Sequence, residues 1–357
     1  MAPGTKVLHR SETVPQNERN EALDAIRIIA AVGVLLFHAR IATQVDPGLL
    51  GAPWLSLNMG VMVFFTLSGY LVTRPFLDGG ITPLDHLTRR MVRLAPAYVA
   101  AVIGWIVVFG AMDLRLGGVA WTLLLEVMFY AALPFILALT AIGARGRHGR
   151  QVLALLALGG LSFVARYVFL GDGATWALTE RVGPLWLWAF VPGMLVACAH
   201  AWYPGIMTLA SDRAGLTLGG VVTLSVLVVP DDPGGPMTIT RMALVAVGTA
   251  ILLPGLMSGR LPIPGRSLLA AAGRSLSYPV YLWHPLVIFA IAAAGIGGWT
   301  AIGLALVVTL VVAAFSWRLV ERPTLTIHRR LRARERPGLP TARGRLRGVE
   351  HMGRSVP

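Results

Sequence analysis

Residues 22–44 read ALDAIRIIAAVGVLLFHARIATQ, an apolar block long enough to cross a hydrocarbon layer of roughly 30 Å as one helix. The whole chain of 357 residues follows the same plan, with 55% hydrophobic and 13% charged residues. Soluble proteins have about 45–50% apolar and about 25% charged residues. The composition therefore excludes a soluble globular protein and predicts an all-α, polytopic membrane helix bundle.

About ten such blocks follow one another along the chain, separated by short polar stretches. We expect spans at residues 22–44, 55–77, 94–112, 119–141, 151–170, 184–203, 214–230, 240–257, 276–296 and 299–320. An even number of spans puts both termini on one side, and cytoplasmic loops carry an excess of arginine. The loops on the side of the termini carry Arg89, Arg90, Arg93, Arg145, Arg147, Arg150, Arg213, Arg260, Arg266 and Arg274, whereas the opposite loops carry Arg115 and Arg181. Both termini are therefore predicted to be cytoplasmic, in a multi-pass protein of the inner (plasma) membrane.

We divide the chain into a cytoplasmic N-terminal segment (residues 1–21), a transmembrane domain (22–320) and a basic tail (321–357) whose low complexity predicts disorder. The net charge of +14 could indicate a nucleic-acid partner, but eleven of the 31 basic residues lie after Trp317. No aromatic residues for base stacking are interleaved there. We interpret the tail as an anchor on the anionic surface of the lipid bilayer and expect no nucleic acid.

The first span carries ionisable residues, which are costly in a membrane and are therefore functional candidates. Arg27 and His38 are eleven residues apart, so they lie on one helix face at a distance of about 16 Å. Asp24 belongs to the same stripe. Counted from the inner boundary, His38 lies about 22 Å into the layer. An interfacial ion pair of Asp24 and Arg27, and a histidine that only bonds a neighbouring helix, remain alternatives.

The fourth span supplies a carboxylate, Glu126, about 10 Å below the outer surface and therefore close to the depth of His38. We expect the two side chains to meet. A histidine oriented by a carboxylate is the usual general base that takes a proton from a hydroxyl. The alternatives are a neutral buried carboxyl group and a proton-relay carboxyl group of a transporter.

Three further segments carry candidate residues. His284 in the ninth span lies about 12 Å from the inner face, below His38 and not beside it, and a hydrogen-bonded histidine in a packed aromatic cluster is the alternative. Ser68 in the second span is small and permits close approach of another helix. Arg90 and Arg93 share a face if their segment is helical and are suited to phosphate binding, although anchoring at the inner surface explains them equally well.

Taken in order, these segments resemble acyltransferase family 3, the bacterial membrane acyltransferases that move acyl groups onto carbohydrates and related acceptors. The resemblance covers about residues 20–325 and rests on six short motifs. They are Arg27 to His38, Phe64 to Gly69, Arg90 to Arg93, Trp121 to Tyr130, Tyr281 to His284, and Glu321-Arg322-Pro323.

The resemblance implies O-acyl transfer from cytoplasmic acyl-CoA, with acetyl-CoA as the expected donor, to a hydroxyl of a glycan or glycosylated small molecule, often a component of the cell envelope. It implies that Arg27 and His38 are the essential pair and that Arg90 and Arg93 bind the donor. We expect His38 to act as general base with Glu126 orienting its ring, and no metal ion. A covalent acyl-histidine intermediate remains open.

The remaining candidates are assigned to the two substrates. Ser68 and His284 join the arginines at the donor site. The acceptor site is predicted to be an aromatic wall and one carboxylate, formed by Trp121, Tyr130, Tyr281, Trp283 and Asp24. The alternative function is a proton-coupled transporter or flippase of a small solute or glycan, in which Asp24, Glu126 and the histidines relay protons.

Overall fold

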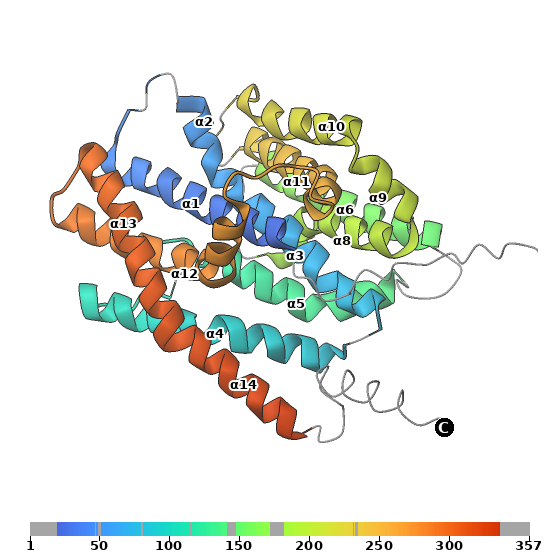
Figure 1. Ribbon diagram of the computed structural model, residues 1–357. Helices are drawn as coiled ribbons and strands as arrows, with labels where there is room; N and C mark the ends of the chain where they lie inside the picture. The colour runs from blue at the N-terminus through green and yellow to red at the C-terminus, as the bar shows by residue number, and fades with distance from the viewer. Residues whose placement is uncertain are drawn as a thin grey trace, which may run out of the picture.

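The computed structural model describes residues 20–46, 48, 51–79, 81–114, 116–140, 148–171, 182–230, 232 and 235–335. Within these ranges every regular element is a helix (Figure 1), as the sequence predicts. The predictions for residues 1–19 and 336–357, and those for Arg115, Arg145, Arg147 and Arg181, lie outside the described residues.

The helices overlap the predicted spans. Their bounds are α1 (Glu21–Thr43), α2 (Gly51–Leu55), η2 (Ser56–Met59), α3 (Gly60–Leu77), α4 (Pro83–Phe109), α5 (Trp121–Leu139), α6 (His148–Gly171), η3 (Gly183–Trp186), α8 (Leu187–Trp202), α9 (Pro204–Ala210), α10 (Arg213–Leu224), η4 (Ser225–Leu227), α11 (Pro236–Met257), α12 (Arg266–Ala293), α13 (Gly298–Ser316), η5 (Trp317–Glu321) and α14 (Arg322–Glu335). Among the described residues, nine helices are long and apolar enough to cross a membrane. The predicted span 214–230 is occupied by a shorter apolar helix, Arg213–Leu227.

Helix α1 packs along α12 and also contacts α3 and α13 (Figure 1). The contact with α12 is close because Gly273 lies on the backbone of α1. A Cβ atom at Gly273 would stand 1.8 Å from the carbonyl oxygen of Asp24, so no larger residue fits without a shift. A glycine also allows α8 to approach α3, since a Cβ atom at Gly193 would stand 1.8 Å from the Thr66 oxygen. Small residues at helix contacts are typical of membrane bundles, where packing drives association.

Two helices begin earlier than the sequence predicts. Helix α4 starts at Pro83 instead of residue 94, and α12 starts at Arg266 instead of residue 276. The added turns contain arginines, which interrupt the apolar block but are good helix formers. Hydropathy therefore marks the apolar part of a helix and underestimates its length. As a result Arg90 and Arg93 lie on a helix and not in a loop.

The C-terminal helices also differ from the prediction. Helix α13 continues through the π-helical turn η5 into α14, so the chain is helical to Glu335 although disorder is predicted from residue 321. Arginine, leucine, alanine and glutamate in this segment all favour a helix. Glu321 is 4% exposed and accepts a hydrogen bond from the Ser316 hydroxyl at 3.3 Å. The low sequence complexity is therefore compatible with an ordered helix in residues 322–335.

Candidate active site

A pocket with about 590 Å³ of empty space, its open mouth included, lies among α1, α3, α4, α5 and α12. Several predicted site residues line it together with apolar and aromatic side chains. The lining residues are Arg27, Val61, Phe64, Phe65, Arg90, Arg93, Leu94, Thr122, Leu123, Glu126, Tyr130, Ser277, Tyr278 and Tyr281. The structure thus brings Arg27, Arg90, Arg93, Glu126 and Tyr130 into one cavity, although they come from three helices.

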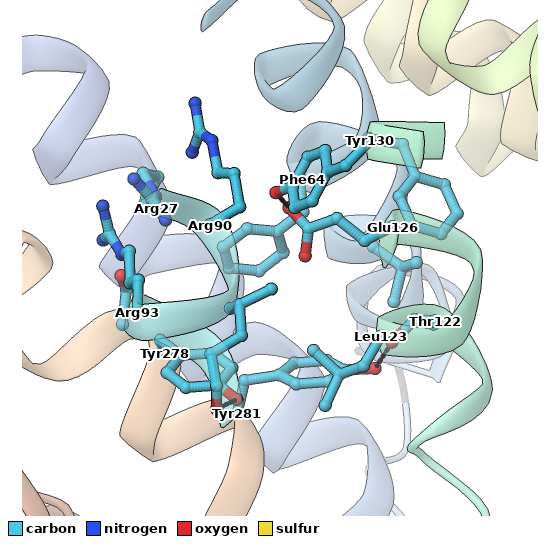
Figure 2. A pocket seen from close by; sticks show the side chains of 14 residues that line it. Arg27, Phe64, Arg90, Arg93, Thr122, Leu123, Glu126, Tyr130, Tyr278 and Tyr281 are labelled. Carbon is cyan, nitrogen blue, oxygen red and sulfur yellow. Dashed lines mark hydrogen bonds between the residues drawn. The ribbon is translucent and has the colours of Figure 1, made fainter. Parts of the chain in front are cut away.

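Three guanidinium groups gather on one side of this pocket (Figure 2), supplied by Arg27, Arg90 and Arg93. In the part of the chain that the structure describes, no carboxylate oxygen lies within 4.0 Å of these guanidinium nitrogens, the limit for an ion pair. The Arg90 guanidinium lies over the Tyr130 ring, 5.2 Å from its centroid. Since Glu126 is the single carboxylate among the lining residues, the pocket carries excess positive charge. Such a site is suited to a polyanionic ligand, because unpaired charges inside a membrane protein are costly.

The Glu126 carboxylate is held by two hydroxyl groups. Ser68 on α3 donates a hydrogen bond to its Oε1 atom at 2.6 Å, and Tyr130, one turn further along α5, donates to the same oxygen. Figure 2 shows Glu126 and Tyr130 pointing toward one another across the pocket wall. Ser68 therefore contacts the pocket through this carboxylate. The two hydrogen bonds fix the orientation of Glu126.

Two tyrosines of α12 join the walls of the pocket. The Tyr281 hydroxyl lies 2.6 Å from the Thr122 hydroxyl and also contacts the Val119 carbonyl at 3.2 Å, while Tyr278 donates to the Leu94 carbonyl at 2.8 Å. Thr122 and Tyr278 are not among the site residues predicted from the sequence. Residues four apart lie on the same face of a helix, so the spacing of Thr122 from Glu126 was a signal that could have indicated it.

His38 and His284 lie side by side, with ring centroids 5.1 Å apart, and neither is among the lining residues of the pocket. The prediction that His284 lies below His38 is wrong. Gly273 of α12 lies against the backbone of Asp24 of α1, and His38 and His284 lie 14 and 11 positions beyond these two residues. Because the helices pack along each other, the two rings come into contact. The error came from the late start predicted for α12.

The predicted contact between His38 and Glu126 is also absent from the described residues. The Nδ1 atom of His38 bonds the Val34 carbonyl on its own helix at 2.8 Å, whereas Ser68 and Tyr130 hold Glu126. Equal depth in the membrane does not make two side chains neighbours. The helix packed along α1 is α12, and so a residue of α12 faces His38.

Three other candidates do not line the pocket. Trp121 packs against the rings of Phe65 and Trp186, with centroids 6.4 and 4.8 Å away. Trp283 packs on the backbone of α4, where its ring occupies the space beside Gly104. Asp24 forms an ion pair with Arg274 at 3.7 Å. In the structure these side chains connect helices instead of forming an acceptor site in the pocket.

Sequence comparison agrees with the architecture and the motifs. The family model described as Acyltransferase domain (Acyl_transf_3) matches residues 20–319, and the chain belongs to this family. Nodulation protein 10 of Rhizobium leguminosarum bv. viciae is 26% identical over 90% of this chain and 98% of its own length. The exopolysaccharide production protein ExoZ of Rhizobium meliloti (strain 1021) is 28% identical over 77% of this chain and 90% of its own length.

A third relative is longer than this chain. The O-acetyltransferase OatA of Staphylococcus aureus (strain NCTC 8325) is 22% identical over 89% of this chain, which spans 59% of that protein. No solved structure matches the chain. The family match confirms the resemblance inferred from the six motifs. The protein is a multi-pass membrane acyltransferase, an acyl donor is one of its substrates, and the transporter alternative is set aside.

Proposed function

We propose that this protein is an O-acyltransferase that moves an acetyl or other short acyl group from cytoplasmic acyl-CoA to a hydroxyl of a carbohydrate or glycosylated acceptor. The observation that carries the proposal is the convergence of Arg27, Arg90 and Arg93 on one pocket with a single carboxylate. Coenzyme A carries several phosphate charges, and arginine binds phosphate through paired, charge-assisted hydrogen bonds. The names of the relatives, an exopolysaccharide production protein and an O-acetyltransferase, favour a polysaccharide acceptor and an acetyl group.

The positions of the arginines support entry of the donor from the cytoplasm. Arg27 and Arg90 lie within the first two or three turns of α1 and α4. With both termini in the cytoplasm, as the arginine distribution predicts, these turns lie at the inner face of the inner membrane. From Arg27 to His38 is about 16 Å along α1. The nucleotide end of acyl-CoA stays at the arginines in this proposal, and its long, thin pantetheine arm carries the thioester toward His38.

The environment of His38 supports its role as general base. A carbonyl oxygen only accepts hydrogen bonds, so the contact with Val34 assigns the proton of the neutral ring to Nδ1 and leaves the lone pair on Nε2. The acceptor hydroxyl gives its proton to this atom while its oxygen attacks the thioester carbon. The carbon–sulfur bond then breaks, and the thiolate of coenzyme A takes up the proton. This direct route needs no acyl-enzyme intermediate.

Tyr281 lies between the pocket and the histidines. It lines the pocket, and its ring centroid is 5.6 Å from that of His284. We expect this side chain to turn aside when the acyl arm enters. Glu126 stays in the pocket, where its carboxylate offsets part of the arginine charge, and it has no part in orienting His38.

The test uses the full chain, purified into lipid nanodiscs, with radiolabelled acetyl-CoA and the polysaccharide fraction of the cells that make the protein. We expect free coenzyme A and labelled polysaccharide in equal amounts. Both should form about 10²–10⁴-fold more slowly with His38→Ala, although that variant inserts and melts like the wild type. The proposal is overturned if coenzyme A is released equally well without the polysaccharide and the polysaccharide carries no label.

A further inference from the structure

His284 has a buried nitrogen that the mechanism above leaves unused. The side chain is 0% exposed, and its Nδ1 atom bonds the Tyr281 carbonyl at 2.7 Å. Its Nε2 atom has no hydrogen-bond partner among the described residues. Buried polar atoms are nearly always hydrogen-bonded, so an orphan of this kind calls for an explanation.

The two histidines are held in the same way. Each Nδ1 atom faces a carbonyl of its own helix, Val34 for His38 and Tyr281 for His284. In the neutral state each ring therefore has its proton on Nδ1 and its lone pair on Nε2. With the centroids 5.1 Å apart, the two Nε2 atoms come to about 3 Å, the distance of a hydrogen bond, when both rings turn these atoms toward each other.

Two neutral rings with this arrangement offer two acceptors and no donor, and one added proton satisfies both. We propose that His284 is a positioning residue that shares the catalytic proton with His38. The inference rests on the proposed function, in which His38 takes the proton of the acceptor hydroxyl. The Nε2–H group of the resulting imidazolium turns to the lone pair of His284, and the shared proton is held until the departing thiolate takes it.

The titratable and charged groups on the helices around the two histidines are engaged elsewhere. Helix α13, which packs on both α1 and α12, has no titratable residue in its sequence, and neither have α2 and η2. On α1, Arg40 donates to the Val45 carbonyl, and on α12 the Tyr281 hydroxyl bonds Thr122. Arg241 of α11 donates to Ser56. On α4, Arg90 and Arg93 line the pocket, and Arg89 is exposed. Among the described residues, the ring contacts of the two histidines join them to each other, to Phe37 and to Tyr281.

The first experiment follows the protons directly in the full chain, labelled with ¹⁵N-histidine and reconstituted in nanodiscs. The ring ¹⁵N shifts distinguish the neutral tautomers from imidazolium. We expect the signals of His38 and His284 to change together in two steps, the first proton being shared. In His284→Phe, which fills the space without an acceptor, His38 should titrate in one simple step. His148→Gln, at a histidine stacked on Trp202 away from the pair, is the control.

The second experiment measures turnover with acetyl-CoA and the polysaccharide fraction. His284→Phe should lower kcat by about a hundredfold and shift its pH dependence, with the KM for acetyl-CoA unchanged because the arginines are intact. His284→Gln, whose amide oxygen lies near the position of Nε2, should recover most of the activity. Comparison of the two variants remains informative even if one of them melts earlier than the wild type.

The outcomes separate this inference from the proposed function. If His38→Ala slows transfer but both His284 variants keep the wild-type kcat and pH profile, the shared proton is refuted and the general base stands. A raised KM with unchanged kcat in the His284 variants would also refute it, and would return His284 to the donor site predicted from the sequence. If His38→Ala keeps its turnover, the proposed function itself fails.

Discussion

Arg27 and His38 lie on one face of α1, three turns apart, yet they face two different environments. Arg27 opens into a polar pocket with two more arginines and a carboxylate, whereas His38 packs beside a second histidine outside the pocket lining. Permanent charges need an opening to solvent or an anionic ligand, while neutral imidazoles tolerate burial. The difference indicates that one helix serves two functions. Its Arg27 end binds the anionic donor, and its His38 end transfers the proton.

The largest effect is expected at the histidine end. His38→Ala should reduce the rate of acyl transfer by about 10²–10⁴-fold, the usual contribution of a general base. Binding of coenzyme A, measured by calorimetry on the same nanodiscs, should not change, because the arginines are untouched. A variant that lost donor binding together with turnover would show that the two regions are not separate.

At the pocket end, removal of one arginine should weaken donor binding. Arg93→Ala is expected to raise the Kd of coenzyme A by about tenfold to a hundredfold, since a hydrogen bond to a charged group contributes about 1.5–3 kcal/mol. The matched control is Arg89→Ala, which removes an exposed arginine of the same helix that does not line the pocket. Equal losses in both variants would indicate general attraction by the inner surface instead of a specific site.

A scaffold change should affect the pocket before the histidine pair. Gly193→Ala forces α8 away from α3, the helix that carries Ser68, and we expect a loss of about 1–3 kcal/mol of stability from overpacking. Thermal unfolding followed by tryptophan fluorescence measures this loss. Gly220→Ala, at a helical glycine with open space around it, is the control. In Gly193→Ala we expect weaker binding of coenzyme A and unchanged ¹⁵N shifts of His38 and His284. A change in both measurements would contradict the separation of the two regions.

The smallest effect concerns the hydroxyls on Glu126. Tyr130→Phe and Ser68→Ala should each lower kcat/KM for acetyl-CoA by roughly twofold to tenfold, the contribution of one hydrogen bond. Because both hydroxyls donate to the same oxygen, the double variant should not lose the sum of the two effects. Tyr98→Phe removes a hydroxyl that bonds the Leu114 carbonyl and serves as control. Strict additivity would show that the two hydroxyls act independently of the carboxylate.

Much of the site could be predicted because the cost of polar groups in a membrane limits the candidates. Arg27 and Glu126 are selected on that ground, whereas Arg90 and Arg93 are selected by their spacing and by the family motif, and all four line the pocket. The contact of His38 with His284 could not be predicted in the same way. To predict this contact one must know where α12 begins and which helix lies beside α1. The pattern of apolar residues gives neither.

The sequence by itself determined that this protein is a bundle of membrane helices, which side chains are polar inside it, and the family to which it belongs. These properties follow from local composition, helical spacing and short motifs, all of which involve residues close together in the sequence. Only the tertiary structure decided that α12 lies along α1, that Ser68 reaches Glu126, and that the two histidines are neighbours. Lateral arrangement depends on close contacts between distant segments, such as Gly273 on the backbone of Asp24, and hydropathy carries no information about them.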